Sequence, residues 1–293
     1  MIDNRLVFIL VLFFLIAPNA HGGLYYNISD YGAKGDSTTL NTTAIQNAIN
    51  DCAETGGTVF IPAGTFVSGT LMLLSNVALH LDHGAVLLAS TDEADYPIHI
   101  PEYRSYTDNY VVRSLIYAEG AEHIAITGSG IIDGRGDAFA DRRSKENPYK
   151  RRPYLIRMIE CQDITIQNIT LRNSPMWVQH YLACSDVLID GITVNSHVAP
   201  NNDGIDIDSC TRVRISDCNI NSGDDAIVLK STSDRPCEDV VVTNCILRSY
   251  CNAFKLGTES NGGFKNIVFS NSSIYDTRLS AIALEMVDGG TLE

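Results

Sequence analysis

A short pattern of hydrophobic and polar residues recurs through the second half of the chain. Each copy has apolar residues three and five positions after its first residue, and the copies begin at Cys161, Cys184, Cys210, Cys237 and Phe264. Successive copies are 23, 26, 27 and 27 residues apart. A period of this length, with several short strands in each repeat, is typical of a solenoid whose coils stack on one another. The pattern therefore predicts an all-β fold, a parallel β-helix.

Two earlier stretches, residues 74–79 and 121–126, resemble further coils with longer loops between them. One helix is predicted over residues 42–53, because its apolar residues recur with a period near 3.6 and Gly56-Gly57 would end it. Asn41 offers a cap for its first turn. Lying before the first coil, this N-terminal capping helix would cover the open strand edges of the solenoid.

Six of the eight cysteines follow the repeat. Four of them begin the copies named above, and Cys218 and Cys245 share another repeat position. We interpret both sets as small hydrophobic residues that point into a stacked core. Disulfides between neighbouring coils stay open as an alternative, since coils about 4.8 Å apart would permit them. A metal site is not predicted, because no paired Cys-x-x-Cys or His-x-x-x-His spacing occurs.

The N-terminus has the pattern of an export signal. Residues 6–17 form an apolar run after Arg5, and small residues suited to cleavage follow near Ala20 and Gly22. A run of 12 residues is too short to span a bilayer. We therefore interpret residues 1–22 as a signal peptide and residues 23–293 as a single β-helix domain, with an uncleaved anchor as the alternative. The mature protein is expected to be a secreted monomer, extracellular or periplasmic, that does not contact the membrane.

Composition and charge narrow the class of partner. The 293 residues include 45% hydrophobic and 19% charged residues, enough to bury a large core, and the net charge is −14. Such an acidic chain is not expected to bind nucleic acid, which needs a basic surface. One segment, residues 142–152, carries six basic residues against one acidic residue. It predicts a local positive patch for an acidic polymer, although a solvated loop explains it equally well.

Two acidic segments 22 residues apart carry the candidate chemistry. Both segments lead from acidic residues into apolar strand patterns, and they read Asn201-Asn202-Asp203-Gly204-Ile205-Asp206-Ile207-Asp208 and Gly223-Asp224-Asp225-Ala226-Ile227-Val228-Leu229-Lys230. Because carboxylates are seldom buried unpaired, the segments predict a shared polar surface with Asp203, Asp224 and Asp225 as catalytic candidates. Asp206 and Asp208 are interpreted as ligands for backbone groups.

Six motifs, taken in order, resemble the polygalacturonase family, glycoside hydrolase family 28. They are Asp30-Tyr31-Gly32-Ala33-Lys34-Gly35-Asp36, Ala44-Ile45-Gln46-Asn47-Ala48-Ile49, Gly56-Gly57-Thr58-Val59-Phe60-Ile61-Pro62-Ala63-Gly64, Asn173-Ser174-Pro175-Met176-Trp177, the segment from Asn201 to Asp206, and Gly223-Asp224-Asp225. The resemblance implies a right-handed β-helix that hydrolyses α-linked galacturonate in pectin with inversion and without a cofactor. It makes Asp224 the general acid, while Asp203 and Asp225 hold and deprotonate the water.

The chain departs from the family at the residues that surround these carboxylates. Asn252 and Ala253 stand where typical members carry a His-Gly pair. Ala283 and Glu285 replace the Arg and Lys of an Arg-Ile-Lys segment that binds the substrate carboxylate in the family. A Glu there would repel that carboxylate, so the sugar at this subsite is expected not to be galacturonate.

Two lysines keep another interpretation open. Lys255 lies in the Ala283 column one coil earlier and Lys230 in the Glu285 column two coils earlier, so the cations are either displaced or simply paired with carboxylates. Trp177 and His180 follow Ser174-Pro175 one coil before Asp203, where they would either flank the cleft as a sugar-stacking platform or pack as ordinary coil residues. The candidate substrate-binding residues are therefore Asn201, Asn252, Lys230, Lys255, Trp177 and Glu285.

The last residues, 286–293, start another coil without a capping element, so we expect further C-terminal coils to be missing. Three functions remain open. The first is a hydrolase of pectin, or of a rhamnogalacturonan-type or other acidic polymer. The second is a lyase, which would need a calcium site and an arginine base beside the acidic segments. The third is a non-catalytic polysaccharide-binding β-helix, which the missing histidine and cations favour.

Overall fold

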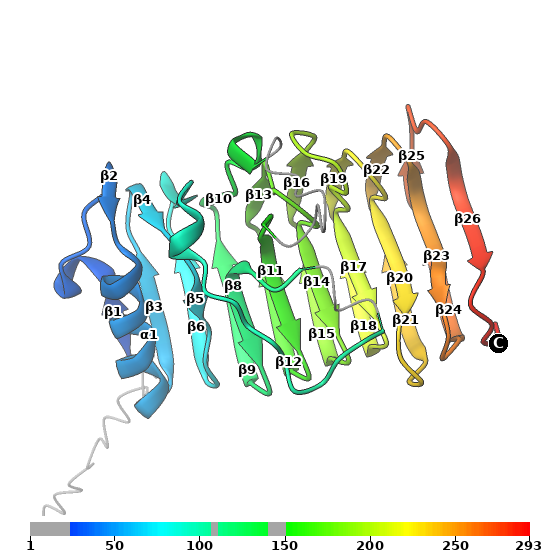
Figure 1. Cartoon of the computed structure of the whole chain (residues 1–293), viewed down its shortest axis with the longest axis horizontal. Coiled ribbons are helices and arrows are strands. Elements are labelled where there is room, and N and C mark those ends of the chain that lie inside the picture. The colour runs from blue at the N-terminus through cyan, green and yellow to red at the C-terminus, as the bar shows by residue number, and fades with distance from the viewer. Residues whose placement is uncertain (1–23, 107–110, 140–150) are drawn as a thin grey trace, which may run out of the picture.

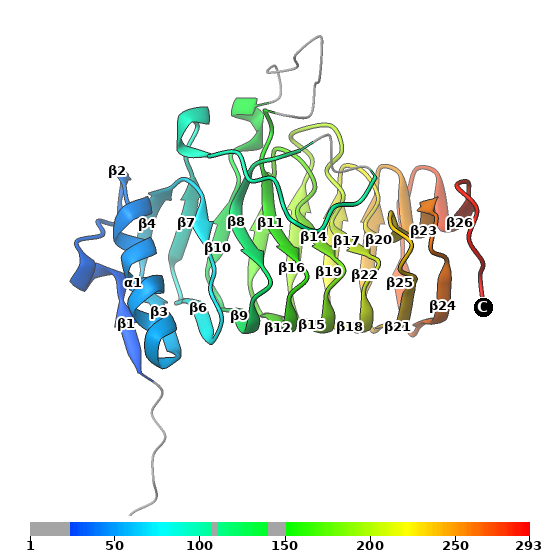
Figure 2. The ribbon, with the colours of Figure 1, turned by 60° about the horizontal axis from the view of Figure 1, so that its bottom comes forward.

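The computed structural model describes residues 24–106, 111–139 and 151–293. These residues form a right-handed parallel β-helix, in which three parallel sheets run along one axis and the chain visits each sheet once per coil (Figures 1 and 2). The all-β solenoid predicted from the repeat is confirmed. No helix in the described ranges is long and apolar enough to cross a membrane. The predicted signal peptide, and residues 142–150 of the basic segment, lie outside the described residues.

The three sheets contain nine, nine and eight strands. Sheet A comprises β1 (Tyr25–Asn27), β3 (Gly57–Ile61), β6 (Val77–Leu81), β9 (Glu122–Gly128), β12 (Gln162–Gln167), β15 (Ser185–Asp190), β18 (Thr211–Ser216), β21 (Cys237–Thr243) and β24 (Phe264–Ser270). Sheet B comprises β2 (Asp36–Leu40), β4 (Gly64–Ser68), β7 (Ala85–Ala89), β10 (Ile131–Asp133), β13 (Thr170–Arg172), β16 (Thr193–Ser196), β19 (Asn219–Ser222), β22 (Ile246–Ser249) and β25 (Ser273–Ile274). Sheet C comprises β5 (Leu71–Met72), β8 (Ser114–Glu119), β11 (Tyr154–Ile159), β14 (Gln179–Leu182), β17 (Ile205–Asp208), β20 (Ile227–Ser231), β23 (Asn252–Ser260) and β26 (Ser280–Met286).

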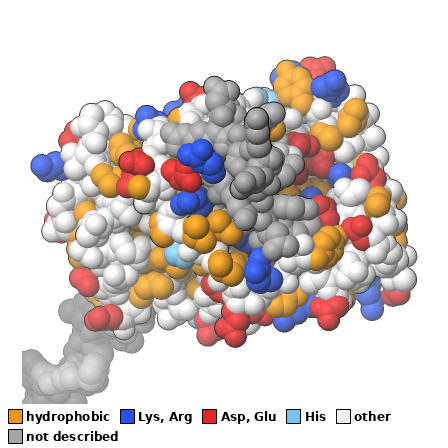
Figure 3. All heavy atoms as spheres, viewed as in Figure 1, with side chains coloured by type: hydrophobic (Ala, Val, Ile, Leu, Met, Phe, Trp, Pro, Cys, Tyr) orange, Lys and Arg blue, Asp and Glu red, His pale blue; other side chains and the backbone are white. Residues whose placement is uncertain are grey.

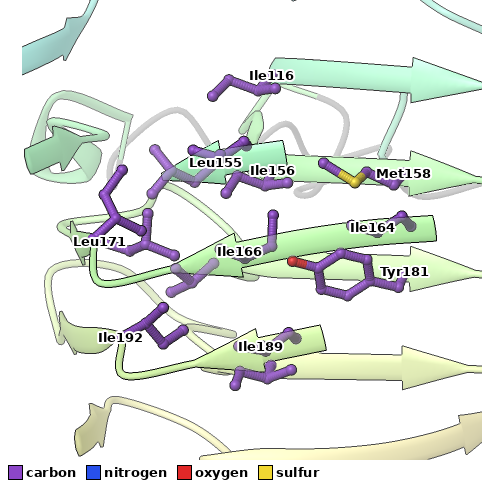
Figure 4. Packing of buried hydrophobic residues seen from close by; sticks show 14 of the residues in the cluster. Ile116, Leu155, Ile156, Met158, Ile164, Ile166, Leu171, Tyr181, Ile189 and Ile192 are labelled. Carbon is purple, nitrogen blue, oxygen red and sulfur yellow. The ribbon is translucent and has the colours of Figure 1, made fainter. Parts of the chain in front are cut away.

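The coils stack in the register that the repeat predicts. Ile124 pairs with Ile164 across sheet A, and the column continues through Val187, Val213, Val240 and Ile267. Inward side chains from successive coils therefore pack in rows along the axis (Figure 4). The earlier coils also align as expected, since Leu79 pairs with Ile126. At the other end, Leu292 forms a parallel bridge with Phe264, which is the start of another coil.

The sharp bends of each coil depend on residues that tolerate a left-handed backbone. Where strands of sheet A begin, Asp163, Asp186, Asp239 and Asn266 have φ between 54° and 56°. Short polar side chains adopt this conformation at lower cost than bulky ones. In four of the five copies an Asp or Asn two positions after the repeat start therefore shapes the coil, while Arg212 holds the same conformation in the copy that begins at Cys210. The hydrophobic pattern alone does not reveal this feature.

The predicted helix is α1 (Thr42–Thr55), which extends two residues beyond the predicted end and stops at Gly56 with φ of 73°. Its buried residues face sheet A and the neighbouring η1 (Ile28–Tyr31), so it covers the N-terminal coils. The predicted Asn41 side-chain cap is wrong. Its amide instead bridges the backbones of Lys34 and Thr39, because burial of Asn41 demands partners from the loop that folds over it.

The cysteine columns are confirmed as core elements. Cys161, Cys184, Cys210 and Cys237 occupy one column and are at most 1% exposed, and the backbone N–H of Cys184 donates to Sγ of Cys210 over 3.3 Å. Cys218 and Cys245 form the second column. All eight cysteines are free thiols, so the alternative of disulfides between coils is not what the structure contains. The columns stabilise the fold by close packing of small side chains.

Enlarging one member of the cysteine column is expected to destabilise the fold. In Cys184→Leu the added methylenes would meet Cys161 and Cys210 directly, and the free energy of unfolding should fall by about 1–3 kcal/mol. Urea denaturation measures this change. The matched control is Val241→Leu, since Val241 lies on the outer face of β21 and is 39% exposed. Equal stability of the two variants would contradict the packing role.

Candidate active site

The catalytic candidates meet at the entry to two adjacent strands of sheet C. Asp203 lies before β17, and Asp224 and Asp225 lie before β20, which pairs with β17 in register. The N–H of Gly204 donates to the backbone carbonyl of Asp225 over 2.9 Å, which fixes the two bends against each other. The structure therefore brings together the three carboxylates that the sequence singles out, on neighbouring coils.

Asn202 holds the bend that carries Asp203. This amide is fully buried and donates to the carbonyls of Ser174 (2.8 Å) and Met176 (3.0 Å). Its Oδ1 accepts from Ser196 Oγ and from the N–H of Ala199. Sequence reasoning missed this positioning role, although the Asn lies inside a motif it quotes. Asn202 thus joins the motif that begins at Asn201 to the motif that begins at Asn173, beneath the site.

Both carboxylate oxygens of Asp225 have polar partners. Its Oδ1 accepts from the N–H (3.0 Å) and from Nδ2 (2.8 Å) of Asn252, and its Oδ2 lies 3.1 Å from Nζ of Lys255. Asp225 is 3% exposed, so these contacts are shielded from water. Asn252, predicted to bind substrate, lies beneath Asp225 and orients it. This arrangement suits a carboxylate that accepts a proton.

Asp224 has the opposite character. Burial, and then the charge of Asp225, raises the pKa of its carboxyl above the ordinary value. A hydrogen bond from Cys251 acts against this and lowers the pKa of the carboxyl. One ligand atom each of Asp224, Asp225 and Cys251 lies within 4.8 Å of the others. A carboxyl that stays protonated in a partly open site is suited to donate a proton.

Cys251 was not predicted as a site residue. It is one of the two cysteines outside the stacked columns, and this break from the pattern is the signal that could have identified it. The thiol is half-buried, and its pKa is raised to about 12 by burial and then by the neighbouring carboxylates. It therefore acts at this site as a neutral hydrogen-bonding group.

Asp203 is 4% exposed and lies deeper than Asp224. Burial, and then the charge of Asp224, raises the pKa of Asp203 well above its ordinary value. Its Oδ1 has no hydrogen-bond partner among the described residues. This oxygen is also buried from solvent, which accounts for the raised pKa of the carboxyl.

A second tier of carboxylates lies along β17, and one of its two predicted roles is wrong. Asp208 accepts from Thr232 N–H (2.9 Å) and Oγ1 (2.6 Å), as expected for a residue that ligates loop groups. Asp206 is fully buried, yet neither of its oxygens has a hydrogen-bond partner within the described part of the chain. It ligates no backbone group, because its side chain points outward from a regular strand toward the lysine of the next coil.

Lys230 is paired with carboxylates. Its Nζ lies 3.0 Å from Glu259 and 3.7 Å from Asp206. Burial alone would lower the pKa of this amine, but the charges of Asp206 and Glu259 outweigh it and raise the pKa above the ordinary value. Nζ also lies 4.8 Å from the centroid of the Trp177 ring, which is only 8% exposed. Trp177 therefore packs as a covered residue against Lys230 and Tyr154, its ring 5.6 Å from that of Tyr154.

Lys255 lies closer to the catalytic candidates. Its Nζ bridges Oδ2 of Asp225 at 3.1 Å and Oε2 of Glu285 at 3.3 Å. Across sheet C, Lys255 pairs with Ala283, as the repeat predicts. Glu285, the acid that departs from the family pattern, is thus the counter-ion of this lysine, and its side chain is 41% exposed. Acidic and basic side chains gather on this face toward the C-terminal coils (Figure 3).

Asn201, the remaining substrate-binding candidate, accepts a 3.0 Å hydrogen bond from Arg152. Arg152 is 2% exposed and also donates to the carbonyls of Pro175 and Pro200. Its expected place in a surface patch is therefore wrong, because three loop acceptors draw it into the interior. Arg151, its neighbour in that patch, pairs with Glu93. Arg152 thus lies beside the first acidic segment, where a lyase would need an arginine base, but its guanidinium is buried and donates to these three acceptors.

The described geometry offers the elements of acid–base chemistry. One carboxylate accepts hydrogen bonds from Asn252 and pairs with Lys255, burial raises the pKa of the other two carboxyls, and the three groups lie on adjacent bends. Such a difference in environment among neighbouring carboxylates is the usual basis for assigning an acid and a base.

Comparison with known proteins places this geometry in context. The model of the family described as "Glycosyl hydrolases family 28" matches residues 53–282. A probable polygalacturonase of Vitis vinifera is 38% identical over 270 residues, which cover 86% of this chain and 54% of the relative. A probable rhamnogalacturonase A of Aspergillus oryzae is 26% identical and is covered over 51% of its length. The chain thus spans about half the length of these curated relatives.

A solved structure shows the same architecture. The hyperthermoactive exopolygalacturonase of Thermotoga maritima superposes with a TM-score of 0.82 at 26% sequence identity. The match covers 92% of this chain and 71% of that structure.

Proposed function

This chain belongs to glycosyl hydrolases family 28, and from that membership we propose that it hydrolyses glycosidic bonds in an acidic pectic polysaccharide. The observation that carries the proposal is the cluster of Asp203, Asp224 and Asp225 on adjacent bends. Its members differ in environment, since Lys255 and Asn252 hold Asp225 while burial raises the pKa of the other two. Hydrolysis needs such a division between a proton donor and a proton acceptor.

In this mechanism the protonated Asp224 donates its proton to the glycosidic oxygen as the bond from the anomeric carbon to that oxygen breaks. A water attacks the anomeric carbon from the opposite face, and its proton passes to Asp225. Asp203, on the neighbouring bend, helps to position that water. The configuration inverts, the sugar that keeps the anomeric carbon becomes a reducing end, and the leaving sugar regains a hydroxyl.

The polymer is proposed to be one whose backbone is not plain polygalacturonate. Both lysines near the carboxylates already have acidic partners, so neither offers an uncompensated positive charge to a substrate carboxylate. A neutral or alternating residue at this subsite avoids the repulsion that Glu285 would exert. The relatives include both a probable polygalacturonase at 38% identity and a probable rhamnogalacturonase at 26%, so the choice rests on the charges around the site. We also propose that the protein is exported to an extracellular or periplasmic location and acts as a monomer.

Release of reducing ends from three polymers tests the proposal. The protein is incubated with polygalacturonate, rhamnogalacturonan and methylated pectin, and proton NMR follows the anomer that forms first. Reducing ends with inverted configuration are expected. Products that absorb as unsaturated uronates would indicate a lyase, and polymer binding without any reducing ends would indicate a non-catalytic solenoid. Either result would overturn the hydrolase proposal.

The thiol of Cys251 should set the alkaline limb of the pH–rate profile. Its hydrogen bond lowers the pKa of Asp224, so Cys251→Ala should raise that pKa further. Because Asp224 must be protonated to act, activity is lost as pH rises through its pKa, and the limb should move to higher pH. Cys251→Ser keeps a donor and is the matched control, and a shift of the limb to lower pH would contradict the assignment.

A further inference from the structure

A row of polar and aromatic side chains lies at the corner where sheet B leads into sheet C. The row follows β16, β19 and β22, which succeed one another along the upper edge of the solenoid in Figure 1. The coil of β25 and β26 stacks beyond β22 and β23, so the row has neighbouring coils on both sides. We call this set the corner row, and its members are Asn195, His197, Asn221, Arg248 and Tyr250.

Strand register and side-chain contacts build the corner row. Asn195 pairs with Asn221 across sheet B, and Asn221 pairs with Arg248. Nδ2 of Asn221 donates to Oδ1 of Asn195 over 3.3 Å, and Oδ1 of Asn221 lies 2.7 Å from Nε2 of His197. The rings of His197 and Tyr250 meet edge to face, with centroids 5.0 Å apart. These contacts hold the row in one arrangement, although His197 and Tyr250 are exposed.

The corner row lies directly against the bend that carries the proposed general acid. The N–H of Tyr250 donates to the carbonyl of Ser222 over 3.1 Å. Oγ of Ser222 in turn donates to the backbone carbonyl of Asp224 over 2.7 Å. A Cβ added to Gly223 would lie 3.2 Å from Cα of His197, so this glycine lets the two bends approach closely. A ligand bound on the row would therefore be next to the catalytic carboxylates.

Arg248 supplies the row with positive charge. Its guanidinium carbon lies 5.9 Å from the centroid of the Tyr250 ring, and Arg248 forms no ion pair with any residue that the structure describes. Lys230 and Lys255, on the sheet C side of the site, are both paired with carboxylates. In a chain with a net charge of −14, an uncompensated guanidinium beside the site is available to an anionic ligand.

The side chains of the row suit a sugar that carries a carboxylate. A guanidinium can donate two parallel hydrogen bonds to one carboxylate. The Tyr250 ring is 52% exposed, and it offers an apolar face to the C–H groups of a sugar ring and a hydroxyl to its polar groups. The amides of Asn195 and Asn221 offer donors and acceptors for sugar hydroxyls. A neutral sugar would leave the guanidinium without a partner.

We propose that the corner row is a binding subsite for a uronate residue of the polymer. The inference rests on the proposed hydrolase function and adds to it the place where the negative charge of the substrate is bound. Arg248 would bind the carboxylate, while the subsite beside Glu285 accepts a neutral sugar. An acidic subsite and a neutral subsite on the same site match the alternation of the proposed polymer.

Binding to an inactive background tests this inference without depending on turnover. Calorimetry of Asp224→Asn is carried out with oligosaccharides that alternate rhamnose and galacturonate, and with the same oligosaccharides after their carboxyl groups are reduced to alcohols. Addition of Arg248→Gln should weaken binding of the charged oligosaccharides about tenfold and leave binding of the reduced ones unchanged. An unchanged affinity for the charged oligosaccharides, an equal loss for both kinds, or no binding of either kind would overturn the inference.

Two further variants isolate the contributions of charge and ring. Arg214→Gln is the matched control, because Arg214 is an exposed arginine of β18 in sheet A, and it should leave both affinities unchanged. Tyr250→Ala should weaken both kinds of oligosaccharide, since stacking does not depend on the carboxylate. If Arg248→Gln does not fold by circular dichroism, Arg248→Lys decides, because an ammonium cannot form the bidentate pair and should still weaken binding of the charged kind several-fold.

The hydrolase proposal and this inference can fail separately. If the wild type releases no reducing ends from any polymer, the hydrolase proposal is wrong, and the same calorimetry on the wild type still tests the corner row. If reducing ends are released but Arg248→Gln does not discriminate between the charged and the reduced oligosaccharides, the hydrolase proposal stands and the uronate subsite is wrong.

Discussion

Asp224→Asn is expected to reduce turnover about 10³-fold or more, with little change in stability. General acid catalysis contributes about 10²–10⁴-fold, and the amide cannot donate a proton to the leaving oxygen as a carboxylic acid does. The side chain is only half-buried, and the substitution changes neither its shape nor the core. Reducing-end release from the best polymer measures the rate, and thermal unfolding measures the stability.

The other two carboxylates provide the comparison. Asp203→Asn and Asp225→Asn should also be severe, but Asp225→Asn additionally leaves Lys255 without its shielded partner and should perturb the fold more. Asp217→Asn is the matched control for loss of one acidic charge, since Asp217 is exposed at a left-handed bend that Asn tolerates. A rate near that of the wild type in Asp224→Asn would assign the acid role to another group.

The fold could be predicted because residues that pair in a solenoid recur at a nearly constant spacing in the sequence. Each coil contacts only its neighbours, so residues at the same repeat position are also pairing partners, as Ile164 and Val187 illustrate. The placement of Asp203 beside Asp225 follows from the same rule. Two acidic segments one coil apart in register must share a surface.

The repeat does not determine which hydrogen-bond partners the polar side chains find. Arg152 appears in a run of basic residues, yet three acceptors from two distant loops bury it. Asn41 precedes a helix but bonds to a loop instead of the first turn. These outcomes depend on loops whose paths have no period. The largest example is the hydrogen bond from the Tyr106 hydroxyl to Asp288, which lies 182 positions later in the chain.

Asp206 and Lys230 show the same limit at the site. The sequence places them on adjacent coils with opposite charge, and the structure brings Nζ within 3.7 Å of the carboxylate. It also brings Glu259 to the same amine, because the strand pairing shifts between Leu229 and Ser231 and moves the register by two residues. A shift of strand register of this kind decides which lysines have carboxylate partners. The hydrophobic pattern does not predict such a shift.

Activity on a backbone that alternates rhamnose and galacturonate is expected to exceed activity on polygalacturonate. The resemblance described in the sequence analysis implies that Ala283 and Glu285 stand in place of two cations that bind the substrate carboxylate. A hydrogen bond to a charged group contributes about 1.5–3 kcal/mol, which corresponds to about 10- to 100-fold in binding. Discrimination follows the difference in transition-state binding, so the loss should fall mainly on plain polygalacturonate.

Lys255 is the residue that decides this claim. Its Nζ contacts both Asp225 and Glu285, so Lys255→Ala should weaken the proton acceptor and slow hydrolysis of every polymer. The informative quantity is therefore the ratio of kcat/KM between the two polymers in wild type and variant. If Lys255 only supports Asp225, both activities fall together and the ratio stays constant.

Glu285→Gln supplies the matched test, because it frees Lys255 from one carboxylate without removing the amine. The freed charge should bind a substrate carboxylate better, and activity on polygalacturonate should rise relative to the alternating polymer by several-fold. Wild-type activity that is already highest on polygalacturonate, and that collapses selectively in Lys255→Ala, would show that the cation has moved one coil. In that case the substrate carboxylate competes with Glu285 for Lys255. Lys255 then takes the place of the cations that the resemblance implies one coil later.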